Sequence, residues 1–441
     1  MRRVGRIGAT VVVAALVVLT SACGVTKPAT GASSLLPIVS STAAVTRPPT
    51  SPPPTSPPPA PDSTPPPKET EAPVAAAPQE DNGPYGQPFG LAFPTTSRGA
   101  LVAMWCEPLP GVCRVYTKTT ADGGRSWSGP HAIESVSRPA DVSGLRPWDL
   151  GVSHLAFTSA TDGFAYGPQL FATHDGGTTW TRIDTPDPVL ALDATTQPPL
   201  LLEGHGCDNS GMWCADTYVS NVEAGRIVRA KTQPPFPATQ LTPGDDQVAY
   251  AFANDAVAVT RDAGATWAPV RLPKGACVTD FSATDASSLW IVCGNDGAAG
   301  TMRKQLWRSD DGGASWRGPK ELEYLGYTNH IVAAGKEAAW RFGARAGLFH
   351  TTDGGESWHR AISSIYGEGG GAPNGFAVAG PDNAWILDPG GPWSGAFTLT
   401  MTRDAGQTWR TVTLVPPVPS VGHRVEAATT AWPAAQDAPD G

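Results

Sequence analysis

The stretch Asp311-Gly312-Gly313-Ala314-Ser315-Trp316 occurs in six variants along the chain and decides the fold. The shared form is D-x-G-x-[ST]-W, usually with Ser or Thr two positions before the Asp. An Asp carboxylate can accept backbone N–H groups across a tight turn, and Gly supplies positive φ. We therefore expect a structural turn between two strands at each copy. The copies run from Asp122 to Trp127, Asp175 to Trp180, Asp262 to Trp267, Asp311 to Trp316, Asp353 to Trp358 and Asp404 to Trp409.

The spacing of the copies predicts seven repeat units. Most successive motif Asp residues lie 42 to 53 residues apart, but the interval from Asp175 to Asp262 is 87 residues. Inside it, residues 216–225 keep a strand-and-turn pattern without the motif Asp and Trp, which indicates a degenerate seventh copy. Each unit of about 47 residues is long enough for four short strands.

The repeat resembles the Asp-box, or bacterial neuraminidase repeat, family over about residues 84–415. The resemblance implies an all-β, seven-bladed β-propeller with four-stranded antiparallel blades. In that family the box joins the third and fourth strands and is structural. The composition agrees, because 49 Gly, 45 Pro and only 16% charged residues favour a turn-rich all-β chain. Residues 416–441 form a tail that either completes the first blade or is a loose end.

The N-terminus predicts export. Arg2, Arg3 and Arg6 precede an apolar run over residues 7–19, which is too short to span a bilayer. The segment Leu19-Thr20-Ser21-Ala22-Cys23-Gly24 resembles a bacterial lipobox, although Thr20 stands where that family prefers Leu. We expect a signal peptide over 1–22 and lipidation of Cys23, with an ordinary secretory signal as the alternative. Either alternative places the mature protein outside the cytoplasm.

A linker separates this leader from the domain. Residues 23–83 include the run from Arg47 to Pro67, in which 12 of 21 residues are Pro. Such a segment cannot build a core and favours extended polyproline II. We expect a disordered spacer between the lipid anchor and the folded domain.

The remaining six cysteines fall into three near-neighbour pairs, which favours disulfides in an exported protein. The expected pairs are Cys106–Cys113, Cys207–Cys214 and Cys277–Cys293. The first two flank turns between second and third strands, and the last joins a first strand to a second. The sequence contains no C-x-x-C pair of the kind that binds zinc. We expect neither a metal nor a cofactor.

Unusual residues gather on the face opposite the motif turns, where the resemblance places ligand sites. Exposed aromatic side chains beside polar groups suit sugar or peptide binding. The alternative is a set of ordinary surface loops with anchoring aromatics. The candidates for this face are Arg146, Trp148, Asp149, Asp208, Trp213, Asn295, Asp296, Tyr324, Tyr327, Tyr366 and Trp393.

Binding is the function favoured by the sequence. The F/Y-R-I-P motif of sialidases is absent, and the expected innermost strands contain no Arg to grip a substrate carboxylate. A sialidase-like or xyloglucanase-like glycoside hydrolase is the alternative, although the latter family uses two propellers. The repeat is also similar to that of a non-enzymatic type of seven-bladed propeller, which resembles photosystem II assembly factors. The net charge of -9 does not favour nucleic acid. We expect a monomeric, membrane-tethered domain that binds an envelope protein or glycan.

Overall fold

The computed structural model describes residues 87–106, 111–138, 147–208, 213–298, 301–323, 326–344, 347–362, 375–388 and 397–415. The expected lipidation site, linker and C-terminal tail lie outside these residues.

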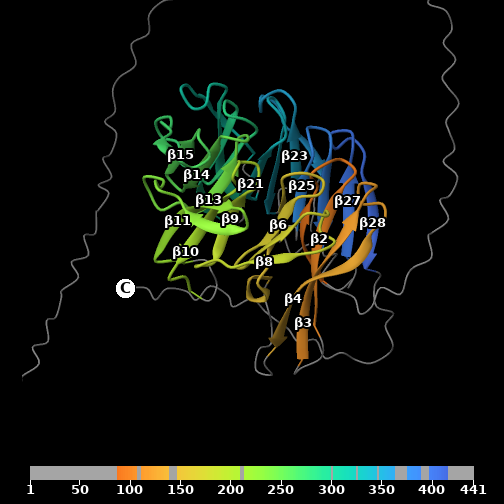
Figure 1. Ribbon diagram of the computed structural model, residues 1–441. Coiled ribbons are helices and arrows are strands. Elements are labelled where there is room, and N and C mark those ends of the chain that lie inside the picture. Colours follow the sequence, from red (N-terminus) through yellow and green to blue (C-terminus); the bar gives the residue numbers. More distant parts are fainter. Residues whose placement is uncertain are drawn as a thin grey trace, which may run out of the picture. The chain divides into compact units, whose positions relative to one another are not determined.

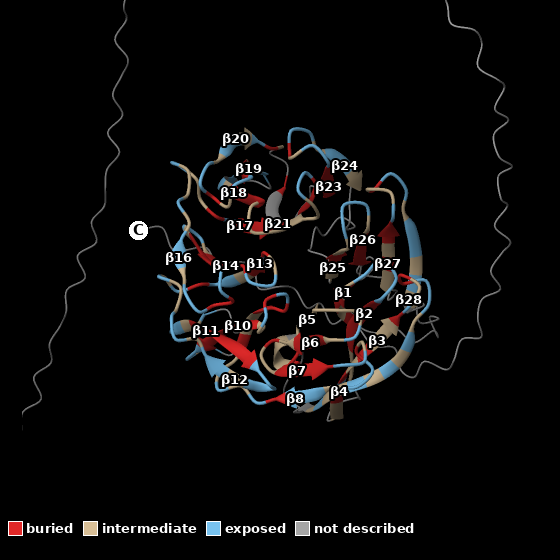
Figure 2. Ribbon diagram, turned by 45° about the horizontal axis from the view of Figure 1, so that its top comes forward, coloured by how far each residue is buried: buried red, intermediate tan, exposed pale blue. Residues whose placement is uncertain are grey.

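The domain is a ring of seven four-stranded antiparallel sheets, as the sequence predicts (Figures 1 and 2). In every sheet the strands are neighbours in chain order, so each blade is a simple meander. The first strand of each blade lies nearest the centre of the ring and the fourth lies at its perimeter (Figure 2). A closed ring covers both faces of each sheet and leaves only short outer edges exposed.

The strands of blades 1 to 4 are β1 (Gln87–Ala92), β2 (Gly99–Cys106), β3 (Gly111–Thr120), β4 (Ser128–Arg138), β5 (His154–Phe157), β6 (Gly163–Tyr166), β7 (Leu170–Thr173), β8 (Thr181–Ile183), β9 (Val189–Asp193), β10 (Leu200–His205), β11 (Asp216–Glu223), β12 (Arg226–Arg229), β13 (Gln240–Pro243), β14 (Ala249–Ala253), β15 (Ala256–Thr260) and β16 (Ala268–Pro269).

The strands of blades 5 to 7 are β17 (Asp280–Ala283), β18 (Leu289–Ala298), β19 (Thr301–Ser309), β20 (Arg317–Glu321), β21 (Tyr327–Ala333), β22 (Ala339–Ala344), β23 (Gly347–Thr351), β24 (His359–Ile362), β25 (Gly375–Val378), β26 (Ala384–Asp388), β27 (Phe397–Thr402) and β28 (Arg410–Val415). A 3-10 turn, η1 (Pro147–Leu150), precedes blade 2. No helix within the described ranges is long and apolar enough to cross a membrane.

The two ends of the ring differ in the turns that they carry. We call "motif face" the end with the turns between first and second strands and between third and fourth strands. Within a blade these two turns are hydrogen-bonded to each other. The amide of Gly123 donates to the carbonyl of Ser97, and the amide of Gly312 donates to the carbonyl of Ser287. We call "loop face" the other end, with the second-to-third turns and the links between blades.

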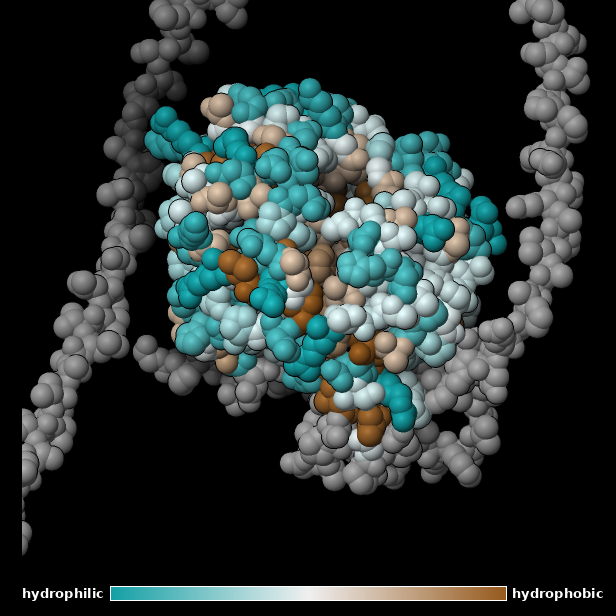
Figure 3. Space-filling view, in the orientation of Figure 1, coloured by the Kyte–Doolittle hydropathy of each residue, from teal (hydrophilic) through white to brown (hydrophobic). Residues whose placement is uncertain are grey.

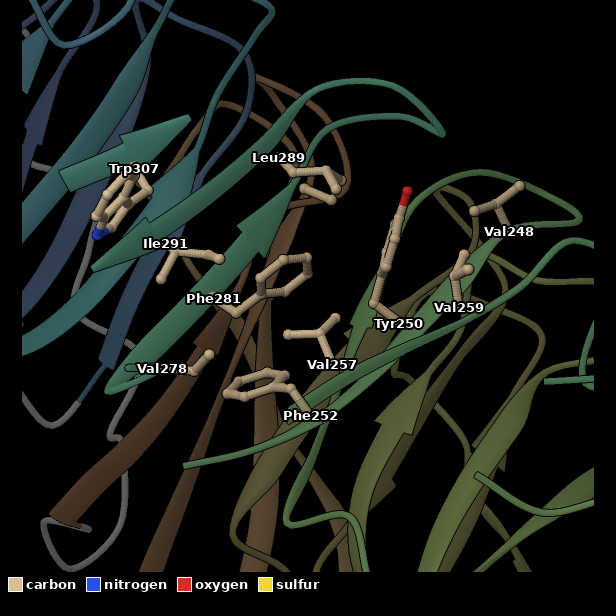
Figure 4. Packing of buried hydrophobic residues seen from close by; sticks show 11 residues of the cluster. Val248, Tyr250, Phe252, Val257, Val259, Val278, Phe281, Leu289, Ile291 and Trp307 are labelled. Atoms are coloured by element: carbon tan, nitrogen blue, oxygen red, sulfur yellow. The ribbon is translucent and has the colours of Figure 1, made fainter. Parts of the chain in front are cut away.

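The hydrophobic core is a ring of interfaces. Each of seven buried clusters combines residues from two adjacent blades, because both sides of every sheet are apolar. Between blades 4 and 5, Tyr250 and Phe252 pack against Phe281, with ring centroids 5.2 Å and 5.6 Å apart (Figure 4). Neighbouring blades therefore stabilise one another, and a blade alone would expose both sides.

The ring closes between blades 1 and 7. Blade 1 contains its own innermost strand, β1. The C-terminal tail lies outside the described residues, and its part in closing the ring stays a prediction. Trp385 of β26 and Phe93, just after β1, lie in the cluster that joins these blades. Among the described residues, side-chain packing joins blades 1 and 7.

Candidate functional site

The motif turns share one hydrogen-bond network. In each of the six copies the Asp Oδ1 accepts the hydroxyl of the Ser or Thr two residues earlier and the backbone amide four residues later. For Asp311, these distances are 2.8 Å from Ser309 Oγ and 2.8 Å from the Ser315 amide. The Ser315 hydroxyl donates to Oδ2 at 2.6 Å. The carboxylate is thus engaged by its own turn.

The same bonds stabilise the ionised form of the motif Asp residues. Hydrogen bonds from Ser315, and then from Ser309, lower the pKa of Asp311 to about 2. For Asp175, the bond from Thr179 outweighs a small effect of burial and lowers the pKa to about 2. A carboxylate with this pKa is a poor proton donor at neutral pH, which fits a structural role.

Each motif Trp packs at the seam between its own blade and the preceding one. Trp409 of blade 7, for example, meets Trp340 of blade 6 edge-on, with centroids 6.1 Å apart. The sequence predicts packing over the hairpin, and the structure adds this contact across blades. The six side chains lie against six different interface clusters: Trp127, Trp180, Trp267, Trp316, Trp358 and Trp409.

Blade 3 departs from the repeat, as its sequence indicates. Its third and fourth strands join at Ala224-Gly225, where φ is 47° and 74°. Two successive positive φ values fit the tight hairpin turn that matches strand twist. The interface between blades 2 and 3 therefore has no motif Trp, and Ile227 packs there instead.

The loop face holds the expected ligand-face candidates only in part. Trp148 and Asp149 lie in η1, half-buried, and Asp208, Trp213 and Asn295 are exposed. Asp296 lies in β18 and Tyr327 begins β21. Outside the described residues lie Arg146, Tyr324, Tyr366 and Trp393. Asp208 and Trp213 lie together in blade 3, whereas Asn295 and Asp296 lie on β18 of blade 5.

Trp213 is the most exposed large apolar side chain among the described residues, at 75%. Its loop is held at both sides. The Asp208 amide donates to the Trp213 carbonyl at 2.8 Å, and the Ala215 amide to the His205 carbonyl at 2.9 Å. An aromatic side chain presented on a braced loop loses little entropy on binding and suits partner contact.

The three expected disulfides are present. Cys106–Cys113 joins β2 to β3 at a Cα separation of 4.0 Å, and Cys207–Cys214 closes the loop between β10 and β11 at 3.8 Å. Cys277–Cys293 has a Cα separation of 5.0 Å. Cys277 lies three residues before β17 and not within the strand, a small correction to the predicted placement. The first two disulfides brace loops of the loop face.

Blade 1 is longer than the other blades. Its outermost strand β4 has 11 residues, whereas the other outermost strands have two to six. β3 and β4 project past the ring at the lower edge of Figure 1, and apolar residues appear at their projecting end in Figure 3. The sequence predicts the disulfide-linked turn there, but not the extension.

Charged and aromatic side chains line the centre of the ring. His154 of β5 is solvent-accessible, yet its pKa is lowered by desolvation and by repulsion from His330 of β21. That combination is expected inside a narrow channel. Asp280 of β17 is buried, and its Oδ2 accepts the Ile331 amide at 2.6 Å and lies 3.6 Å from His330 Nδ1. None of the seven innermost strands contains Arg, as predicted.

A buried acidic group lies between blades 2 and 3. Glu203 of β10 is 0% exposed, and no described residue makes a hydrogen bond of good geometry to either carboxylate oxygen, although the Ser220 hydroxyl lies near enough to act on its pKa. Desolvation raises its pKa, and repulsion from Asp187 adds to this, against an opposing effect of the Ser220 hydroxyl. Asp187 accepts the Tyr218 hydroxyl at 2.6 Å and His205 Nδ1 at 3.1 Å.

A second buried ionic group joins blades 5 and 6. Arg341 is 0% exposed and binds Glu323 through both guanidinium nitrogens, at 2.8 Å and 2.5 Å. Lys304, also buried, donates to the Glu323 carbonyl at 2.9 Å. Glu323 lies in the link between blades 5 and 6, and its carboxylate is engaged by Arg341. Sequence reasoning did not identify Glu203 and Arg341 as buried groups. The signal that could have done so is a charged residue within an otherwise apolar second strand.

A cavity of about 240 Å³ opens on the motif face between blades 1 and 2. Arg98, Thr119 and Ser128 line one side, and Phe157, Asp175 and Thr178 line the other. No group of three His, Cys, Asp or Glu side chains suited to a metal ion occurs in the part of the chain that the structure describes.

Residues 259–413 match a family model described as photosynthesis system II assembly factor YCF48. The match runs from the end of β15 nearly to the end of β28. A search of curated proteins finds no significant match.

Several solved structures are similar. A chain titled YCF48 bound to D1 peptide has 15% identity and a TM-score of 0.44, covering 72% of this chain and 93% of its own. YCF48 from Cyanidioschyzon merolae has 13% identity and a TM-score of 0.44, covering 73% and 97%. The GH74 enzyme of Niastella koreensis has 10% identity and a TM-score of 0.28, covering 74% and 71%.

Proposed function

We propose that this protein is a membrane-tethered, extracytoplasmic scaffold that binds an envelope protein, or a glycan, on its loop face. The observation that carries the proposal is the asymmetry of the two faces. The motif turns are short and repetitive, and their carboxylates are engaged internally. The loop face presents Trp213 on a disulfide-braced loop and the projecting end of blade 1.

Binding is favoured over catalysis. The family matched over residues 259–413 is described as an assembly factor, which supports a scaffold. Glycoside hydrolysis needs two available carboxyl groups flanking the bond. At the centre of the ring, Asp280 already accepts the Ile331 amide, which leaves it poorly placed for such a role. The six motif Asp residues are likewise engaged within their own turns, and the Asp-box resemblance gives them a structural role.

The tether rests on the sequence. Lipidation of Cys23 would fix the chain to the outer surface of the cytoplasmic membrane or another envelope membrane. The Pro-rich run, at roughly 3.1 Å per residue in polyproline II, would then hold the propeller away from that membrane.

Crosslinking and pull-down from the native envelope test the proposal. The wild type should capture a discrete partner, and substitutions on the loop face should abolish its capture. An exposed substitution on the motif face, such as Asp246→Asn, is the matched control. Loss of capture only in motif-face variants would contradict the assignment.

A further inference from the structure

We infer that blade 3 docks a basic segment of a protein partner, with Trp213 stacking on an arginine or lysine side chain. This inference rests on the proposed function and specifies its partner. The blade-3 surface consists of Asp187, His205, Asp208, Trp213 and Asp216, all at the loop-face end of the blade.

The five residues form one connected surface. His205 and Asp216 are register partners at the base of the loop, at the ends of β10 and β11. His205 Nδ1 reaches Asp187 at 3.1 Å. At the loop itself, the Asp208 amide donates to the Trp213 carbonyl, and the Cys207–Cys214 disulfide closes the loop. The Trp213 amide also donates to the Asp208 carboxylate at 3.5 Å, so the indole is held next to that acid.

The charge of this surface indicates a cationic occupant. Asp208 and Asp216 are exposed, and the side chain of Asp187 is 21% exposed. Glu203, fully buried, is the register partner of Tyr218, whose hydroxyl donates to Asp187. A carboxyl group in this low-dielectric position gains from a cation placed above it. The chain as a whole is acidic, with a net charge of -9, which also favours a basic partner.

One of the chain's own cations, Arg229, interacts electrostatically with Asp187 and Glu203. Arg229, at the outer end of β12, stacks over the Tyr218 ring at 3.9 Å, and Lys231 follows it. Arg229 shows that this acidic, aromatic group already holds one guanidinium at the perimeter. The indole of Trp213 offers an equivalent ring face on the loop side. Cation–π contacts of this kind contribute roughly 0.5–2 kcal/mol, depending on exposure.

Blade 3 is also the blade that lacks the Asp and Trp of the repeated motif. Its interface with blade 2 contains no motif Trp. The blade instead contains the buried acid Glu203 and the exposed Trp213. A blade that departs from the repeat in both respects is the one expected to hold a specialised surface.

Fluorescence anisotropy of full-length protein with two labelled peptides tests the inference. One peptide alternates Arg and Ser, and the other alternates Glu and Ser. We expect the Arg peptide alone to bind, more weakly as salt rises. Trp213→Ala and Asp216→Lys should each weaken binding by about tenfold, the equivalent of roughly 1.4 kcal/mol. Trp213→Phe should retain most of the affinity.

The matched control is Asp246→Lys, the same charge change at an exposed Asp of the motif face. Equal weakening by Asp216→Lys and Asp246→Lys would show that net charge alone attracts the peptide, and would overturn the inference. Unchanged affinity in Trp213→Ala, or binding of the Glu peptide, would overturn it too. If the envelope partner still requires the loop face while the Arg peptide fails to bind, the proposed function stands and only this inference fails.

Discussion

The indole of Trp385 in blade 7 stacks on the ring of Phe93 in blade 1, with centroids 3.9 Å apart and planes 5° from parallel. Trp385 Nε1 also donates to the Gly123 carbonyl at 3.0 Å, in the motif turn of blade 1. These two contacts join residues far apart in the chain at the point where the ring closes.

We expect Trp385→Ala to lower the free energy of unfolding by about 3–5 kcal/mol, because it removes a fully buried side chain and opens a cavity at the closure. Urea denaturation followed by circular dichroism measures the change. Trp213→Ala is the control and should shift stability by less than about 0.5 kcal/mol. Similar effects of the two substitutions would show that the Trp385–Phe93 pair does not secure the ring.

The repeated motif makes much of this fold predictable from the sequence. Its Asp, Gly and Ser or Thr act within one turn, so local pattern alone identifies six turns, and the equivalent spacing locates blade 3. The disulfides follow for the same reason, since Cys106 and Cys113 face each other across one hairpin. Contacts between distant segments were not predictable. The stacking of Trp385 on Phe93 and the burial of Glu203 depend on which blades meet, which no local pattern encodes.

Asp353→Asn tests the motif turns through pH. Partial burial tends to raise the pKa of Asp353, but hydrogen bonds from Ser357 and Thr351 outweigh it and lower the pKa to about 2. A pKa that is lower in the folded state stabilises the fold at pH values above the pKa of the unfolded chain, which is about 3.9. This stability is lost as pH falls toward 2. We expect the variant to be less stable than wild type by about 1 kcal/mol at pH 7, after allowance for exposure.

The difference between wild type and Asp353→Asn should shrink as pH falls toward 2 and disappear below it, where Asp353 is protonated and both side chains are neutral. Thermal melts at a series of pH values provide the measurement. Asp246→Asn, on the same face, should show no such pH-dependent difference. A constant deficit of Asp353→Asn across the whole pH range would contradict the role of the ionised carboxylate.

Glu203 should show the opposite pH dependence. Its pKa is raised by desolvation, so it penalises the folded state as pH rises above the unfolded pKa near 4.3. Glu203→Gln removes the ionisation while keeping the shape. We expect the variant to exceed wild type in stability by about 1–3 kcal/mol at pH 8, with no such gain at pH 4.

Urea titrations of Glu203→Gln at pH 4, 6 and 8 give the comparison. The control is Glu223→Gln, an exposed acid of the same blade. A variant that is equally or less stable than wild type at pH 8 would mean that the Glu203 carboxylate has a compensating partner.

The anchor is tested by Cys23→Ala. If Cys23 carries the lipid, the variant should move from the membrane to the soluble fraction, because a short apolar leader alone cannot retain the mature chain. Fractionation of cells followed by immunoblotting measures this. Ser21→Ala is the neighbouring control and should remain membrane-bound. Retention of Cys23→Ala in the membrane would contradict the lipid anchor at Cys23.

Trp148 and Trp316 separate binding from stability. Trp148 lies half-buried in η1 on the loop face, whereas Trp316 packs at the interface of blades 4 and 5, with Nε1 2.9 Å from the Arg271 carbonyl. Trp148→Ala should reduce partner capture and leave the melting midpoint nearly unchanged. Trp316→Ala should lower the free energy of unfolding by about 1–3 kcal/mol and leave capture intact at temperatures where the domain stays folded. Crosslinking yield and thermal melts are measured on the same preparations. The faces would be assigned the wrong way round if Trp148→Ala unfolds the domain while Trp316→Ala selectively abolishes capture.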